Sequence, residues 1–228
     1  MKLLRYGMPG KERPGLLDKN GVLRDLSEIV SDISTETLLP ESIDRLRNID
    51  HVTLPKVKGS QRLGPCVGQV GNFICIGLNY SDHCKESGMD VPSEPVIFSK
   101  VTSAICGPDD DVIIPRNAIK TDLEVELGVV IGKPARYVDE KSALDHVAGY
   151  CVINDLSERE FQLEREGQWI KGKSCDTFGP IGPWLVTPDE VGDPQNLDLW
   201  LEVDGKRYQD GNTRTMIFGV AYLIHYWS

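Results

Sequence analysis

Two glutamates alternate with apolar residues near the middle of the sequence, in Leu123-Glu124-Val125-Glu126-Leu127. In a β-strand, residues two positions apart point to the same face at a spacing of about 7 Å, so Glu124 and Glu126 would share one side. A solvated strand face would produce the same pattern. A third carboxylate, Asp155, directly follows the apolar residues 151–153 and Asn154. Its place at the end of a predicted strand favours a site shared by all three carboxylates.

Three converging carboxylates need a positive charge between them, because each would otherwise raise the pKa of the others. A ligand set made only of oxygen atoms, with room for water and substrate, suits Mg²⁺ or Mn²⁺ better than zinc. The sequence therefore predicts a divalent cation held by Glu124, Glu126 and Asp155.

A histidine and a glutamate lie three residues apart in the polar segment 79–86, directly after a predicted buried strand. On one helical turn the carboxylate of Glu86 could hold the imidazole of His83 and raise its basicity, as a general base requires. A capping turn at the surface is the alternative that local sequence leaves open.

A lysine lies in segment 171–180, whose glycine and proline content predicts an irregular loop. A single loop lysine is commonly solvated. Beside a cation site, however, Lys173 would supply the fixed positive charge that an enolate or a carboxylate requires.

The elements that must position these residues divide into two predicted domains. Short apolar segments separated by Pro and Gly turn signals predict a small, hairpin-rich domain over residues 1–65, and a larger catalytic domain follows over residues 66–228. Strands are predicted at residues 2–6, 22–26, 72–77, 96–98, 112–114, 124–131, 148–154, 183–186 and 197–203, helices at 40–49, 140–146, 156–166 and from 217, and a hairpin turn at Asp204-Gly205. Strands predominate without a βαβα rhythm, so we expect an α+β fold and no parallel nucleotide-binding sheet.

The composition limits the partners of the chain. Its 228 residues carry a formal charge of -10, which disfavours nucleic acid and anionic lipid as partners. No apolar segment reaches the roughly 18 residues of a membrane helix, and the six cysteines form no C-x-x-C pair, so we expect a cytoplasmic protein with reduced thiols. The apolar pattern of the last helix runs to Ser228 without a stop signal, and we expect the catalytic domain to lack its last C-terminal segment.

Several motifs together resemble the fumarylacetoacetate hydrolase (FAH) family, and the resemblance extends over essentially the whole chain. They are GLNYSDH at 77–83, FSK at 98–100, ICGP at 105–108, residues 122–132, NDLS at 154–157 and GKSCDTF at 172–178. The chain is most similar to the bacterial branch of acylpyruvate and 2,4-diketo-3-deoxy-sugar-acid hydrolases (such as 2,4-diketo-3-deoxy-L-fuconate hydrolase), whose members are often named ureidoglycolate lyase. The resemblance implies a strand-dominated, mixed β-sandwich roll with a small N-terminal domain, and a homodimer.

The resemblance also assigns roles to residues. It implies that Mg²⁺ or Mn²⁺ binds Glu124, Glu126 and Asp155, that His83 and Glu86 activate water from a lid helix, and that Lys173 is an active-site lysine. The residues that it places toward the substrate are Tyr80, Lys100 and Gln162. Family members continue beyond the point matched by Ser228, through a Thr-Gly-Thr-Pro turn that contributes a substrate-binding threonine.

The expected activity is hydrolysis of a C–C bond in a 2,4-diketo acid, which gives pyruvate and a carboxylic acid. In this hypothesis His83, oriented by Glu86, takes a proton from the water that attacks C4, while the cation and Lys173 stabilise charge on the C2 oxygen. Two alternatives stay open: a lyase of the same family, such as an oxaloacetate decarboxylase or ureidoglycolate lyase, and a metal-stabilised module that binds a small 2-keto acid without catalysis. The group on C4 and the choice between Mg²⁺ and Mn²⁺ are not predicted.

Overall fold

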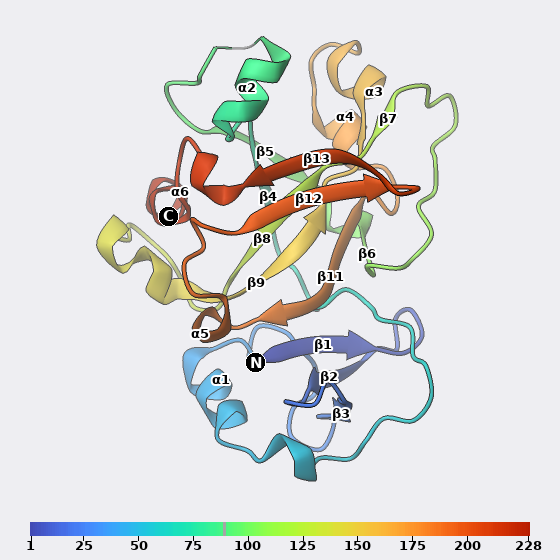
Figure 1. The fold of residues 1–228 in the computed structure, drawn as a ribbon, viewed down its shortest axis with the longest axis vertical. Helices are drawn as coiled ribbons and strands as arrows, with labels where there is room; N and C mark the ends of the chain where they lie inside the picture. The colour runs from blue at the N-terminus through green and yellow to red at the C-terminus, as the bar shows by residue number, and fades with distance from the viewer. Residues whose placement is uncertain (89) are drawn as a thin grey trace.

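The fold of residues 1–88 and 90–228 is described by a computed structural model (Figure 1). In this part of the chain the strands are β1 (Lys2–Tyr6), β2 (Arg13–Leu17), β3 (Leu23–Asp25), β4 (Phe73–Gly77), β5 (Val96–Lys100), β6 (Ile105–Cys106), β7 (Thr121–Asp122), β8 (Val125–Ile131), β9 (Val147–Asn154), β10 (Ser157–Glu158), β11 (Gly179–Val186), β12 (Asp198–Val203) and β13 (Lys206–Asn212). The helices are α1 (Pro40–Arg47), α2 (Ser81–Ser87), α3 (Arg159–Leu163), α4 (Ile170–Lys173), α5 (Pro188–Val191) and α6 (Val220–Trp227), and the 3₁₀ segments are η1 (His51–Thr53), η2 (Thr102–Ala104), η3 (Glu140–His146) and η4 (Thr213–Thr215).

One sheet connects the N-terminal strands β1, β2 and β3 to the later strands β8, β9 and β11. Its strands follow the order β3-β2-β1-β11-β9-β8, and β6 pairs with β11 in parallel. Strand β1 joins the N-terminal hairpins to β11 through the antiparallel pairs Lys2↔Val186 and Leu3↔Leu185. Leu3 and Leu185 are fully buried in one hydrophobic core that also includes Leu46 and Ile153. The predicted division near residue 65 stays a prediction, and the chain on either side of it shares this sheet and this core.

The pairing of β8 with β9 brings two predicted ligands together. Val125 is opposite Asn154 in the antiparallel register, so the residue before β8 lies beside the residue after β9. The backbone N–H of Asp155 donates to the carbonyl oxygen of Glu124 at 2.9 Å, which extends the ladder by one step. Because both carboxylates leave the sheet at the same end, their side chains can meet.

Most predicted strands are present, and the strand-dominated α+β class is confirmed. The predicted turn at Asp204-Gly205 connects β12 to β13 with φ values of 51° and 78°, as a two-residue hairpin turn requires. Strand β2, which contains Pro14, was not predicted from the sequence.

Three local predictions are wrong. Residues 112–114 form no strand, because the N–H of Ile113 donates to the side chain of Thr177 instead of to a neighbouring strand. The predicted helix at 156–166 is limited to Arg159–Leu163, since Ser157–Glu158 pair with β7. Lys173 lies in no irregular loop but at the end of the short helix α4.

Segment 140–146 was predicted as a helix and is the 3₁₀ helix η3.

In the residues that the structure describes, no helix is both long enough and apolar enough to cross a lipid bilayer.

Candidate active site

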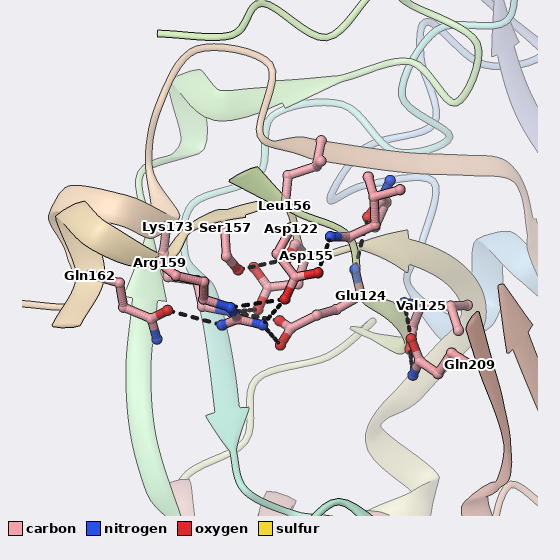
Figure 2. Close-up of polar contacts among 12 residues, drawn as sticks. Asp122, Glu124, Val125, Asp155, Leu156, Ser157, Arg159, Gln162, Lys173 and Gln209 are labelled. Atoms are coloured by element: carbon pink, nitrogen blue, oxygen red, sulfur yellow. Dashed lines mark hydrogen bonds and ion pairs between the residues drawn. The ribbon is translucent and has the colours of Figure 1, made fainter. Parts of the chain in front are cut away.

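A cluster of charged side chains lies where β8 begins and β9 ends, near helices α3 and α4 (Figure 2). The Nζ atom of Lys173 lies 2.6 Å from Oε2 of Glu124 and 2.6 Å from Oδ2 of Asp155. Only 3% of the Lys173 side chain is exposed, against 8% for Asp155 and 21% for Glu124. The structure therefore places the predicted lysine between two of the three predicted metal ligands.

A second lysine contacts the other side of the same aspartate. Lys100, the last residue of β5, donates from Nζ to Oδ1 of Asp155 at 2.6 Å and to the carbonyl oxygen of Leu156 at 2.9 Å. Burial lowers the pKa of Lys100, and the neighbouring Asp155 opposes that shift. Each carboxylate oxygen of Asp155 thus contacts one ammonium group.

Arg159 is part of the cluster and was not predicted. Its guanidinium donates to Oε1 of Glu124, to Oδ2 of Asp122 at 2.7 Å and to Oε1 of Gln162 at 2.9 Å. The predicted substrate residue Gln162 is buried, and its side-chain oxygen is oriented by this contact. An arginine between two glutamates in the sequence looks like an ordinary exposed helix residue, so only the register of β8 and β9 could have revealed its role.

The two glutamates of the cluster have opposite electrostatic surroundings. Burial acts to raise the pKa of Glu124, but Lys173 and Arg159 outweigh it and lower that pKa to about 2. Burial raises the pKa of Glu126 to about 8, and the nearby carboxylates Glu124 and Asp155 add to the shift. Glu126 is therefore the carboxylate of this cluster that most needs a further positive charge.

Close packing brings Lys173 into the cluster. A Cβ atom added to the preceding residue, Gly172, would lie 2.3 Å from the carbonyl oxygen of Glu158 and 2.6 Å from the backbone nitrogen of Gln162. Helix α4 can approach α3 this closely only because residue 172 is glycine. The Nζ atom of Lys173 also lies 5.0 Å from the centre of the Phe98 ring, which adds a cation–π contact.

Tyr80 lies between β4 and α2, and its hydroxyl group points into the protein. The hydroxyl oxygen is buried and has no hydrogen-bond partner among the described residues. Burial raises the pKa of Tyr80, and the charge of Glu126 adds to the effect. A buried hydroxyl without a partner is available to a bound polar molecule, and the substrate contact of Tyr80 stays a prediction.

The two residues predicted to activate water, His83 and Glu86, make no described contact with this cluster. His83 and Glu86 are exposed on the seven-residue helix α2, which is set apart from the strand ends of the cluster in Figure 1. Residues in the left-handed conformation flank this helix, with φ of 53° at Leu78 and 65° at Gly88. No described hydrogen bond or ion pair links His83 or Glu86 to Glu124, Asp155 or Lys173.

The donor set fits a divalent cation by its chemistry. Its three carboxylates supply only oxygen ligands, and no described hydrogen bond or ion pair reaches the carboxylate of Glu126. Lys173 contacts the other two carboxylates, and among the described residues no group of three or more His, Cys, Asp and Glu side chains is arranged so that it could hold a metal ion. Glu124, Glu126 and Asp155 are the residues that would hold the ion.

Known proteins with similar sequences share this architecture. A family model described as "Fumarylacetoacetate (FAA) hydrolase C-terminal" matches residues 72–228. The chain belongs to the fumarylacetoacetate hydrolase family. A Burkholderia multivorans protein is 65% identical over 228 residues, which is all of this chain and 81% of that protein, and its name, "Putative hydrolase", specifies no substrate.

Two solved structures of the FAH family superimpose over the whole chain. The fumarylacetoacetate hydrolase from Exiguobacterium antarcticum is 34% identical, with a TM-score of 0.82 over 81% of its length. The maleylpyruvate hydrolase from Sphingobium sp. SYK-6, solved with manganese(II) and pyruvate, is 25% identical, with a TM-score of 0.82 over 83% of its length. The predicted fold class is thereby confirmed at the level of the family.

Proposed function

We propose that this FAH-family protein is a Mg²⁺- or Mn²⁺-dependent hydrolase that cleaves a C–C bond in a 2,4-diketo acid, an acylpyruvate or a 2,4-diketo-3-deoxy sugar acid. The observation that carries the proposal is the buried cluster, in which Lys173 contacts Glu124 and Asp155 beside the uncompensated Glu126. The manganese and pyruvate bound to the Sphingobium maleylpyruvate hydrolase support the cation and the keto-acid part of the substrate.

The cluster is suited to hold charge at the 2-keto end of a substrate. A bound Mg²⁺ or Mn²⁺ would supply Lewis-acid chemistry toward the carboxylate and keto oxygens. Lys173 adds an ammonium group that is shielded from water, where electrostatic stabilisation of a developing enolate is stronger than in solvent. Tyr80 and Gln162 have polar atoms that can orient the substrate.

The hydrolytic step is assigned to helix α2. His83, oriented by Glu86, takes a proton from water while the water oxygen bonds to C4 of the substrate. The C3–C4 bond then breaks, its electron pair passes into the enolate of pyruvate, and C3 takes up a proton. Because both residues are exposed and no described hydrogen bond or ion pair links them to the cluster, this step requires α2 to move toward the substrate.

The same separation favours a second candidate within the family. Decarboxylation of oxaloacetate uses the electron sink at C2 but needs no attacking water, so the buried cluster alone would be sufficient. A non-catalytic binding module is disfavoured, because binding alone would not need the His83/Glu86 pair together with the buried ammonium group of Lys173.

A substrate panel separates these functions. The purified protein would be incubated with acylpyruvates, 2,4-diketo-3-deoxy sugar acids, oxaloacetate and ureidoglycolate, with Mn²⁺, with Mg²⁺ and with a chelator. Pyruvate plus a carboxylic acid, lost with chelator, supports the hydrolase; release of CO₂ from oxaloacetate alone supports the decarboxylase. Binding of a 2-keto acid without turnover of any compound would leave only the binding module.

The proposed partners are a small 2-keto acid and a second copy of the chain. The homodimer is implied by the family resemblance alone, and light scattering coupled to gel filtration would test it.

A further inference from the structure

Two lysines contact Asp155, and their surroundings differ. The side chain of Lys100 is 0% exposed, and its ammonium group donates to Oδ1 of Asp155 and to the carbonyl oxygen of Leu156. Lys173 is 3% exposed and contacts Asp155 through Oδ2, and it also contacts Glu124. Lys100 therefore binds Asp155 and the next residue in the chain, Leu156, whereas Lys173 connects two predicted metal ligands, Asp155 and Glu124.

The position of Lys100 is set by regular structure. It ends β5, where it pairs with Phe73 of β4, and the next backbone N–H, that of Val101, donates to Oγ of Ser174 at 2.9 Å. Its ammonium group thus projects from an anchored strand end onto the segment that follows β9. A group so enclosed cannot contact a substrate unless Asp155 and Leu156 also move.

We propose that Lys100 is a positioning residue, and no substrate ligand, that fixes the carboxylate of Asp155 by clamping Oδ1 and the Leu156 carbonyl, so that Oδ2 faces the cation site. This inference rests on the proposed function, because the cation site is part of it. Of the two carboxylate oxygens of Asp155, the clamp holds Oδ1, whereas Oδ2 contacts Lys173, which also contacts Glu124. It resembles the outer contacts that orient metal-binding carboxylates in other proteins.

The sign of an affinity change distinguishes a clamp from a mere nearby charge. If Lys100 acts only as a positive charge near the cation, removing it lowers repulsion and strengthens cation binding. If Lys100 orients Asp155, removing it frees the carboxylate and weakens binding, by about 10 to 100-fold for such outer contacts. Lys173→Met is the matched control, since it removes the same charge from the same carboxylate.

Mn²⁺ binding to the full chain would be measured by calorimetry and by the loss of the free-ion electron paramagnetic resonance signal, without substrate. We expect Lys100→Met to weaken Mn²⁺ binding at least tenfold, and Lys173→Met to leave it equal or tighter. Added propylammonium should partly restore Mn²⁺ affinity to Lys100→Ala, because a small amine can replace the clamp; a general packing defect would not respond in this way.

The negative results can be told apart. If the wild-type chain binds no Mn²⁺, the proposed function is contradicted, because it requires a bound divalent cation. If the wild type binds Mn²⁺ and Lys100→Met binds it equally well or more tightly, the clamp is overturned. If Lys100→Met does not fold, Lys100→Arg keeps the charge but changes the shape of the donor: weaker Mn²⁺ binding supports the clamp, and unchanged binding overturns it.

Discussion

The residues predicted for the active site occupy two contrasting regions of the molecule. Lys100, Lys173 and Asp155 are buried and connected by hydrogen bonds from three separate parts of the chain. His83 and Glu86 are exposed on the short helix α2. The first region is held by contacts between distant parts of the chain, whereas the second lies on a single helix of seven residues.

This difference separates two tasks that an enzyme of this kind must perform. Charge at the keto end has to be stabilised in a preorganised, water-poor environment, which buried contacts between strand ends provide. A base that must meet water and admit substrate benefits from a mobile element with few buried contacts. Substitutions in the first region should therefore change stability and chemistry together, and those in the second should change chemistry alone.

The largest effect is expected from Asp155→Asn. The substitution leaves the buried ammonium group of Lys100 without a carboxylate and that of Lys173 with Glu124 alone, which costs about 3 to 5 kcal/mol of unfolding free energy. Chemical denaturation with chelator present would measure it. Asp109→Asn, at an exposed position, should change stability by less than about 0.5 kcal/mol. Equal stability of the two variants would show that the cluster is not held by charge.

His83→Gln should produce the opposite profile. We expect turnover of the diketo acid to fall by about 10² to 10⁴-fold, the usual contribution of a general base, while the unfolding free energy changes by less than about 0.5 kcal/mol. Rates at saturating Mn²⁺ and denaturation curves would be compared. Loss of stability comparable to that of Asp155→Asn would remove the contrast between the regions, and an unchanged rate would remove His83 from the mechanism.

The pH dependence of stability should show the uncompensated charge of Glu126. Its folded pKa, about 8, is above its ordinary value of 4.5, so the folded state binds its proton more tightly than the unfolded state does. This contribution is full below pH 4.5 and is lost as pH rises through about 8. The folded pKa of Glu124, about 2, gives the opposite sign: stability present above pH 4.5 and lost toward pH 2.

Glu126→Gln tests that assignment. With chelator present, melting temperatures of the wild type should fall between pH 5 and pH 8, and the variant should show a smaller fall. Parallel curves for the two proteins would mean that Glu126 does not carry the predicted shift.

A smaller effect is expected at Gly172. A Cβ atom there meets the backbone of Glu158 and Gln162, so Gly172→Ala should cost about 1 to 3 kcal/mol and move Lys173 away from the carboxylates. Gly211→Ala, where a Cβ atom meets nothing within 4 Å, is the control. Denaturation curves and Mn²⁺ titrations of both variants measure the effect, and equal results would show that α4 adjusts without strain.

Local patterns predicted much of the fold, and long-range contacts explain what they missed. Alternation around Glu124 and Glu126 and the apolar residues 151–153 indicated β8 and β9, because such short local patterns are typical of strands whatever they pair with. The helix predicted at 156–166 began too early, since the buried carboxylate of Glu158 accepts hydrogen bonds from Lys120 and Thr121, far away in the sequence.

The candidate site shows the same limit. Residue types and the family resemblance were sufficient to nominate Lys100 and Lys173, but which oxygen of Asp155 each contacts depends on where β5 and α4 end. Arg159 was missed because nothing in its local sequence distinguishes it from a surface residue. A buried ion-pair arrangement is a property of tertiary packing and leaves little trace in the spacing of the chain.

The pairing of β1 with β11 has a consequence for dissecting this protein. The family match begins at residue 72, so a fragment that starts there looks like a natural unit. Such a fragment would lack β1, which pairs with Leu185 and Val186 of β11. Their backbone groups would become an open edge able to recruit a strand from another molecule. Such a fragment should aggregate, and adding residues 1–71 as a separate peptide should suppress that by restoring the missing neighbour.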